Sequence, residues 1–247
     1  MNNAYQAADA AIKYLDFLNS IDGKIQQQVL SREILRHLPQ NPQTKILDAA
    51  CGSGWLAGHL QKSYPGIEAC DSSPLLIKFA QTHFPKIPFA ECGLEKPLPY
   101  PANNFDAIIL NMAAPDLENL SLAFKNLSVA LKPKSSLIIT IPNPEFTSPA
   151  AVWHRSLADV IFWRKPKLIF KKPPSGGTKF QRYFGNSKIP CFYYTMENYL
   201  LAAGAAGLKL KQKTEITSAQ DSKKFDLNYK LFRYPLFLLL EFVKIGQ

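Results

Sequence analysis

The stretch "KILDAACGSGWL", residues 45–56, joins a short apolar run to an acid and a glycine-rich turn. Residues 45–49 are predicted to form a buried strand, because parallel strands covered on both faces are short and almost continuously apolar. Directly after the glycines, "WLAGHLQKSY" resumes the spacing of a helix. A strand, a glycine turn and a helix in this order indicate a βα unit.

Strands and helices are predicted to alternate about five times along the chain, and this pattern is typical of a doubly wound parallel sheet. Ser73 is a suitable cap for the second of these helices, with Pro74 at its first position. A later helix is expected to stop at Gly207 and to lead into a sixth strand. Residues 230–244 are expected to form a final strand at the edge of the sheet. The expected strands cover 45–49, 65–71, 87–92, 103–113 and 135–144, followed by these two.

The chain is therefore predicted to be a single α/β domain built on a mainly parallel, seven-stranded sheet. Residues 1–40 are expected to form an N-terminal helical cap, and 45–145 the ligand-binding core. Residues 147–195 are rich in aromatic and basic residues and are expected to be an inserted lid, helical to about 165 with a basic loop at 171–190. Residues 196–247 then complete the sheet with a helix and strands.

Composition narrows the class of protein further. The chain has 247 residues, 47% of them hydrophobic and 19% charged, which is ordinary for a globular protein. It carries a net charge of +10, and residues 151–247 hold nearly all of the excess, with 17 Lys and Arg against 6 Asp and Glu. No signal peptide or membrane-spanning stretch is expected, and four scattered cysteines favour neither zinc nor disulfides. These features predict a cytoplasmic protein without a metal.

The acid at the end of the first strand decides between ligands for the turn. Dinucleotide-binding turns seat a pyrophosphate, yet Asp48 would repel one at close range, and Gly58 lies one residue late for that motif. S-adenosylmethionine carries an ammonium and a sulfonium and no phosphate, so its charge suits the acid. A second acid at the end of the next strand would hold ribose hydroxyls, and Asp71 follows Asp48 by 23 residues.

With these two acids around the turn, the chain resembles the class I S-adenosylmethionine-dependent methyltransferases. The first motif of this family is similar to "ILDAACGSGWLAGHL", in which Ala50 replaces a glycine, and the second is similar to "ACDSSPLLIKFAQ". The family places an acid on the adenine where this chain has Gly93, and Glu91, Cys92 or the Leu94 backbone are the candidate substitutes. The resemblance implies a Rossmann-like methyltransferase fold and a cofactor site formed by Asp48, Ala50, Cys51, Gly52, Gly54, Asp71, Ser72, Gly93, Leu94, Asn111 and Met112.

The resemblance also implies direct methyl transfer from S-adenosylmethionine to an acceptor, leaving S-adenosylhomocysteine. Such a reaction mainly needs alignment and exclusion of water, with a base only for a protonated acceptor. The candidates for that base are His154, Tyr193 and Tyr194. A small organic acceptor, quinone-like or lipid-like, is expected between the sheet, the N-terminal helix and the lid, near Tyr14, Trp153 and Arg182. Basic residues of the lid are expected to attract any carboxylate or phosphate on it.

Three alternatives stay open. The basic and aromatic strip "FWRKPKLIFKKP", residues 162–173, would suit stacking on RNA, although no RNA-binding module or N-P-P-Y-type motif accompanies it. The same strip would suit an anionic membrane surface, with a lipid as the acceptor. Third, a non-enzymatic module that binds or has lost the cofactor is compatible with Ala50, with Gly93 and with the Lys134-Ser135-Ser136 run that follows Pro133 where the family usually has LKPGG. The sequence says nothing about the oligomeric state.

Overall fold

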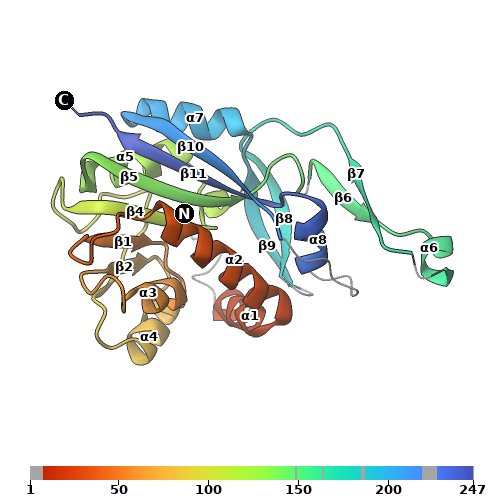
Figure 1. Cartoon of the computed structure of the whole chain (residues 1–247), viewed down its shortest axis with the longest axis horizontal. Helices are drawn as coiled ribbons and strands as arrows, with labels where there is room; N and C mark the ends of the chain where they lie inside the picture. The colour runs from red at the N-terminus through yellow and green to blue at the C-terminus, as the bar shows by residue number, and fades with distance from the viewer. Residues whose placement is uncertain (1–7, 148, 163, 185–186, 219–226, 247) are drawn as a thin grey trace.

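The predicted seven-stranded α/β sheet is confirmed (Figure 1). We describe a computed structural model, which covers residues 8–147, 149–162, 164–184, 187–218 and 227–246. The strand order is β10-β11-β5-β4-β1-β2-β3; β11 is antiparallel to both of its neighbours, β10 and β5, and the other neighbouring pairs are parallel. The strands are β1 (Ile46–Ala49), β2 (Glu68–Asp71), β3 (Phe89–Glu91), β4 (Phe105–Asn111), β5 (Leu131–Pro142), β10 (Leu208–Ile216) and β11 (Phe237–Lys244).

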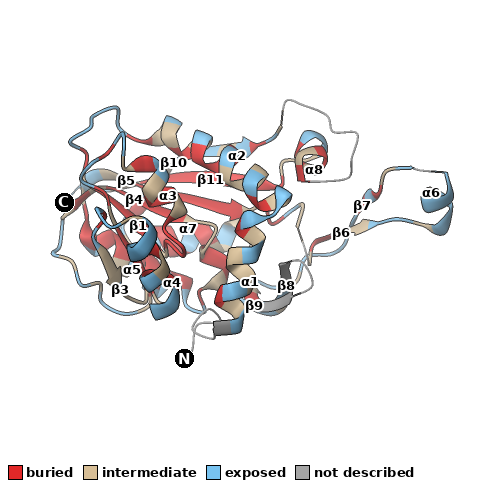
Figure 2. Cartoon of the chain, turned by 90° about the horizontal axis from the view of Figure 1, so that it is seen from below, coloured by how far each residue is buried: buried red, intermediate tan, exposed pale blue. Residues whose placement is uncertain are grey.

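Helices cover both faces of the sheet, and each face has its own core. Because side chains alternate along a strand, Leu47 and Leu110 pack with α5 (Leu120–Ala130) and α7 (Met196–Ala205), whereas Ile46 and Ile109 pack on the other side. That second face is covered by α2 (Ile21–His37), α3 (Trp55–Leu60), α4 (Pro74–His83) and α8 (Leu227–Arg233). The central strands are buried from both sides, as Figure 2 shows.

Caps fix the helix beginnings that follow the strands. Ser73 Oγ accepts a hydrogen bond from the Leu76 amide and Pro74 occupies the first helical position, as predicted. Thr195 and Asn198 form a reciprocal capping box at the start of α7, and Gly207 ends this segment in the left-handed region at φ +70°. The N-terminal segment is helical as expected, with α1 (Ala8–Asn19) followed directly by α2.

The expected position of the final strand at the sheet edge is wrong. Strand β11 lies between β5 and β10, and it begins only at Phe237, because residues 227–233 form α8. Six consecutive residues of β11 are buried, whereas most of β10 is exposed or half-buried. Burial of the more apolar strand therefore favours β11 inside and β10 at the edge.

One acid interrupts this apolar strand, and hydrogen bonds explain why it is tolerated. Glu241 is 2% exposed, and its carboxylate accepts from Ser136 Oγ at 2.7 Å and from Lys211 Nζ at 2.8 Å. The ring of His37 on α2 lies 3.0 Å from its other oxygen. Burial alone would raise the pKa of Glu241, but these three partners lower it.

The segment from 147 to 195 also differs from its prediction of a helix and a basic loop. It forms two antiparallel hairpins, β6 (Ala151–His154) with β7 (Lys167–Phe170), and β8 (Thr178–Phe184) with β9 (Ser187–Tyr193). Aromatic and β-branched residues dominate these stretches and favour extended backbone. The only helix described here is the short α6 (Leu157–Ile161). We call residues 150–172 the arm, because Figure 1 shows β6, α6 and β7 reaching away from the sheet.

No helix within the described ranges is both long enough and apolar enough to cross a bilayer.

The tight junction between α1 and α2 generates a first prediction. A Cβ added at Gly23 would lie 2.0 Å from the Phe17 carbonyl oxygen and 2.9 Å from the Leu18 Cα. Since both are backbone atoms, G23A is expected to lower the free energy of unfolding by about 2 kcal/mol, as measured by urea denaturation. The matched control is G204A on α7, where a Cβ meets nothing within 4 Å and alanine favours the helix. Equal stability of the two variants would contradict this account of the junction.

Candidate functional site

The site is organised by the turn that follows β1, where three residues adopt left-handed backbone. Ala50, Gly52 and Gly54 have φ values of +57°, +56° and +74°. At Gly54 a Cβ would lie 3.0 Å from the Ala80 Cβ and from the Phe89 ring, so the turn packs closely under α4 and β3. Ala50 adopts its angle against an intrinsic preference of about 1–2 kcal/mol. The turn therefore keeps its shape even where the family glycine is replaced.

Asp48 lies beneath this turn and holds α3 in place. Its side chain is 2% exposed, and its Oδ2 accepts a hydrogen bond from the Ala57 amide at 3.1 Å. Burial raises the pKa of Asp48 to about 7, an effect that the Ala57 bond opposes and the nearby Asp71 carboxylate reinforces. Asp48 does not line the pocket described below, so it can act on a ligand only through the turn and through its charge.

Asp71 closes the turn from the neighbouring strand. Its Oδ2 accepts from the Gly52 amide at 2.8 Å, and its Oδ1 accepts from the Ser73 amide at 2.9 Å. Burial raises the pKa of Asp71, although these backbone bonds partly offset the effect. A carboxylate has about four acceptor positions, so both oxygens can still accept from a ligand. Asp71 lines the pocket and is the residue on this edge best placed to hold a pair of hydroxyls.

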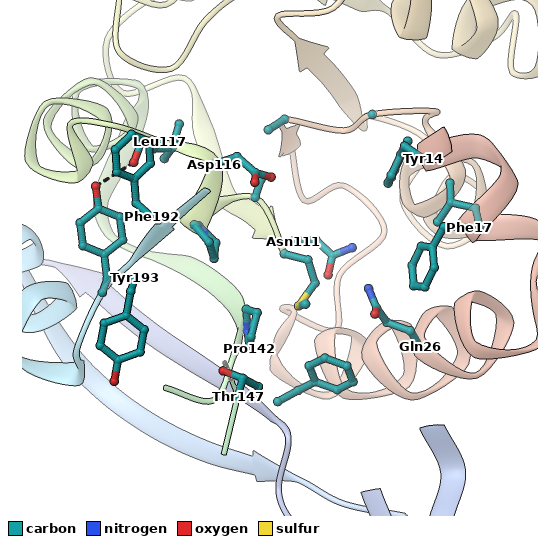
Figure 3. A pocket seen from close by; sticks show the side chains of 18 of the residues that line it. Tyr14, Phe17, Gln26, Asn111, Asp116, Leu117, Pro142, Thr147, Phe192 and Tyr193 are labelled. Carbon is teal, nitrogen blue, oxygen red and sulfur yellow. Dashed lines mark hydrogen bonds between the residues drawn. The ribbon is translucent and has the colours of Figure 1, made fainter. Parts of the chain in front are cut away.

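A pocket of about 440 Å³ opens at the carboxyl end of the parallel strands (Figure 3). The turn and the ends of β2 and β4 form one side of it. Its other walls come from α1, α2, β8, β9 and the loop after β5, and they are largely aromatic and proline side chains. Among the lining residues that the structure describes there is no Lys, Arg or His, whereas Asp22, Asp71 and Asp116 are present. The pocket therefore suits an apolar ligand with no negative charge.

Two amides face the middle of this pocket. Asn111 ends β4, and its Oδ1 accepts from Thr140 Oγ1 of β5 at 2.6 Å, which leaves its amide nitrogen toward the cavity. Gln26 points toward it from α2 on the opposite wall. Met112 then turns the chain away at φ +59°, with its amide bonded to the Thr140 carbonyl at 2.9 Å. Left-handed backbone in non-glycine residues is concentrated at functional sites, and Ala50 and Met112 both border this pocket.

The structure brings together about half of the predicted site residues. Tyr14 of α1 covers the turn, since a Cβ at Gly52 would lie 2.7 Å from its hydroxyl. The residues that line the pocket are Tyr14, Ala50, Gly52, Asp71, Asn111, Met112, Tyr193 and Tyr194.

The remaining cofactor candidates lie around the pocket rather than in its wall. Cys51 is buried, with its Sγ 3.8 Å from the Gly52 carbonyl oxygen, and Gly54 caps α3. Ser72 is in the loop before α4, a Cβ added at Gly93 would meet nothing within 4 Å, and Leu94 is packed in the core. The predicted adenine contacts at Gly93 and Leu94 stay predictions.

Three of the predicted catalytic and substrate residues are not found in the pocket wall. His154 and Trp153 lie on β6 in the arm, and neither lines the pocket; the Trp153 ring packs instead against Tyr234 at 5.7 Å. The side chain of Arg182, on β8, is outside the described residues. Among the side chains of the lid that the structure describes, no Lys or Arg lines the pocket.

Tyr193 and Tyr194 do line the pocket, but their hydroxyls are already donors. Tyr193 donates to the Pro144 carbonyl at 3.2 Å, and Tyr194 donates to the Leu117 and Glu118 carbonyls at 2.7 and 3.0 Å. Burial raises the pKa of both, for Tyr194 to about 12. A phenol with a raised pKa and a backbone acceptor is a poor proton acceptor at neutral pH, so neither suits the predicted role of base.

Sequence reasoning missed the residues that form the acceptor side of the pocket. Phe17, Asp22 and Gln26 come from the two N-terminal helices, Asp116 from the loop after β4 and Phe192 from β9. They belong to no motif, and only the tertiary arrangement brings them together. Asp116 follows "NMAAP" at the end of β4, and its position after a strand end was the one available signal.

Comparisons with known proteins agree with this geometry. Residues 47–139 match a family model described as a methyltransferase domain. The chain is 28% identical over 215 residues to the mitochondrial ubiquinone biosynthesis O-methyltransferase of Homo sapiens, across 77% of this chain and 58% of that protein. It is 29% identical over 156 residues to a malonyl-[acyl-carrier protein] O-methyltransferase of Hahella chejuensis, across 60% and 53%. The chain thus spans little more than half the length of these relatives.

Solved structures share the fold. An S-adenosylmethionine dependent methyltransferase from Mesorhizobium loti superimposes with a TM-score of 0.70, at 20% identity, over 86% of this chain and 96% of that one. The geranyl diphosphate C-methyltransferase of Streptomyces coelicolor, solved with S-adenosyl-L-homocysteine, gives a TM-score of 0.59 at 15% identity, over 89% and 79%. The sheet and its flanking helices are therefore those of the Rossmann-like methyltransferase fold.

The buried Asp48 carboxyl predicts an unusual pH dependence of stability. Its pKa is about 7 in the folded protein against an ordinary value of 3.8, so the folded state holds this proton more tightly. The protonated Asp48 therefore contributes fully to the free energy of unfolding below about pH 4. This contribution is lost as the pH rises to about 7, by up to about 1.4 kcal/mol per pH unit. D48N keeps an oxygen for the Ala57 amide without the ionisation. Its free energy of unfolding, measured by urea denaturation from pH 5 to 8, is expected to fall less than that of the wild type.

D106N is the matched control for this measurement. Asp106 pairs with Lys132 at 2.6 Å, and that bond and the Lys45 amide outweigh burial and lower its pKa. Removing this carboxylate should leave the decline between pH 5 and 8 in place. A D48N profile parallel to that of the wild type would show that Asp48 titrates normally.

Proposed function

We propose that the chain is a class I S-adenosylmethionine-dependent methyltransferase, and that it methylates a small organic acceptor without negative charge in the aromatic pocket. The observation that carries this proposal is the pair of buried acids around the glycine turn, where Asp71 bonds the Gly52 amide at 2.8 Å and Asp48 lies beneath. Two carboxylates so close to the turn disfavour binding of a pyrophosphate and favour binding of a cationic ligand.

The residues of the turn fit S-adenosylmethionine. Asp71 would accept hydrogen bonds from the ribose hydroxyls, because the backbone amides around it do not occupy all of the acceptor positions of its carboxylate. The left-handed turn brings backbone close to the pocket at Gly52, with Tyr14 above it. The negative charge on Asp48 and Asp71 supports binding of the sulfonium and ammonium groups.

The cofactor supplies a methyl group on a positively charged sulfur, which is already a good leaving group. The task of the chain is therefore to orient the acceptor and to exclude water. The amides of Asn111 and Gln26 supply polar contacts in the middle of the cavity, and the bond from Thr140 holds Asn111 in one orientation. Tyr194 keeps η2 (Ala114–Asp116) and the loop after it against β9, through its two carbonyl partners.

A planar, quinone-like ring is the acceptor that these walls support best. Phe17 and Phe192 are on opposite sides of the pocket in Figure 3, and rings prefer such surroundings. Two of the relatives are named a ubiquinone biosynthesis O-methyltransferase and a demethylmenaquinone methyltransferase, the second from Streptomyces avermitilis. An RNA acceptor is less well supported, since the described lining carries acids and no cations to meet phosphates.

Calorimetric titration with S-adenosylmethionine and S-adenosylhomocysteine tests the cofactor site. The wild type is expected to bind both, and D71A to bind each at least tenfold more weakly, because a charged hydrogen-bond partner contributes about 1.5–3 kcal/mol. E68Q is the matched control, since Glu68 begins the same strand and pairs with Lys45 at the far end. Thermal melts confirm that each variant is folded. A folded wild type that binds neither ligand would overturn the proposal and leave the non-enzymatic module.

The affinity should also depend on pH through Asp48. Because its pKa is about 7 without ligand, raising the pH from 6 to 8 ionises Asp48 and strengthens its attraction for the sulfonium. The Kd for S-adenosylmethionine is expected to fall by up to roughly tenfold over this range. S-adenosylhomocysteine lacks the sulfonium, so its Kd should change less between pH 6 and 8. In D48N the Kd of neither ligand should change over this range. An affinity for S-adenosylmethionine that weakens as pH rises would contradict this coupling.

A further inference from the structure

The tip of the arm carries an exposed apolar surface that nothing in the described chain covers. Leu157, Ile161 and Phe162 are 83%, 68% and 67% exposed, and Val160 is 51% exposed. No residue of α6 is buried, and Figure 2 draws this helix in the exposed colour far from the sheet. Single exposed apolar residues are common, but a contiguous group at the end of a projection marks an interaction site. We call these four residues the tip.

Lys and Arg residues flank the tip in the sequence of the arm. Residues 150–172 contain six Lys and Arg and a single acid, Asp159. The Asp159 carboxylate accepts from the Ser156 amide at 3.0 Å and from Ser156 Oγ at 2.7 Å, so it serves as part of the helix cap. The cations are Arg155, Arg164, Lys165, Lys167, Lys171 and Lys172.

The base of the arm is anchored beside the pocket by aromatic contacts. The Phe146 ring lies 5.7 Å from both Phe170 and Tyr234, and Trp153 lies 5.7 Å from Tyr234. Lys165 lies over the Tyr229 ring of α8 at 4.0 Å. Pro144 and Thr147, on either side of Phe146, line the pocket itself. The arm is thus attached at the pocket rim while its apolar tip points into solvent.

We infer that the arm docks the protein on an anionic lipid bilayer, with the tip inserted among the acyl chains and the cations at the headgroups. Apolar side chains combined with Lys and Arg are the composition of surfaces that lie in the membrane interface, and each cation adds attraction to anionic lipid. A nucleic acid would use the cations but would have no contact for the aliphatic Leu157, Val160 and Ile161. A second copy of the chain is opposed by charge, since two arms with the same excess of cations repel each other.

Docking through the arm goes beyond the proposed methyl transfer and does not depend on it. Because Pro144 and Thr147, which precede the arm in the chain, line the pocket, the arm would hold the pocket near the bilayer surface. An apolar acceptor dissolved in the bilayer would then have a short path to the pocket. The inference therefore also predicts the membrane as the source of the acceptor if the proposed function holds.

Vesicle sedimentation tests the docking directly. The full chain is mixed with vesicles of phosphatidylcholine alone, or of phosphatidylcholine with about one-third phosphatidylglycerol. We expect binding to the anionic vesicles that weakens as salt is raised, and little binding to the neutral ones. The variant L157S/I161S/F162S should partition at least tenfold more weakly, because it removes the apolar insertion. The matched control is L200S/L201S on α7, two residues that are 41% and 64% exposed on the body of the protein, and it should bind like the wild type.

Several results would overturn the inference. One is that the wild type does not sediment with anionic vesicles. Another is that the folded tip variant binds these vesicles as well as the wild type does. A dimer in gel filtration that disappears in the tip variant would assign the tip to self-association instead. Retained affinity for S-adenosylmethionine in the tip variant, measured by calorimetry, shows that the pocket is intact and separates failure of docking from failure of the proposed function.

Discussion

The hydrogen bond from the Gly52 amide to the Asp71 carboxylate, 2.8 Å long, joins the ends of two neighbouring parallel strands. It can form only if the chain after β1 turns through left-handed backbone, as it does at Ala50, Gly52 and Gly54. The same turn directs the Ala57 amide onto Asp48 and so fixes the start of α3. Because Asp71 also bonds the Ser73 amide, one carboxylate sets the positions of the turn, of β2 and of the loop into α4. The pocket borders this arrangement and takes its shape from it.

The sheet could be predicted because its information is local. Each parallel strand is a short apolar run, and the turns and caps next to it, such as Gly52 and Ser73, can be recognised within a few residues. The position of β11 in the sheet could not be predicted in this way, because an apolar strand can lie either at the edge or in the interior. The outcome depended on comparing its burial with that of β10, where exposed lysines favour the edge. The hairpin of the arm was missed because residues 147–165 have no strict alternation that separates a strand from a helix.

The same distinction explains which part of the site could be predicted. Asp48, Gly52 and Asp71 stand at fixed places in a βα unit, so their spacing was enough to indicate a turn for a cationic ligand. The acceptor side comes from α1, α2, the loop after β4 and β9, which meet only when the chain is folded. Tyr193 was predicted as a base from its residue type, and its actual role depends on a carbonyl of Pro144 that is 49 residues away in the chain. The residue type of a tyrosine suggests that it could act as a base, but whether its hydroxyl is available for that role depends on its hydrogen-bond partner.

The net charge of +10 conceals a division of charge that the fold makes visible. Near the ligand the chain places carboxylates, with Asp22, Asp71 and Asp116 lining the pocket and Asp48 beneath the turn. About half of the Lys and Arg of residues 151–247 lie elsewhere, on the arm and on β10, where Lys211 is paired with the buried Glu241. If cations lined the pocket they would oppose a sulfonium, and if acids surrounded the tip they would oppose an anionic surface. The two binding surfaces thus require opposite charge, and the length of the arm keeps them apart while its aromatic base connects them.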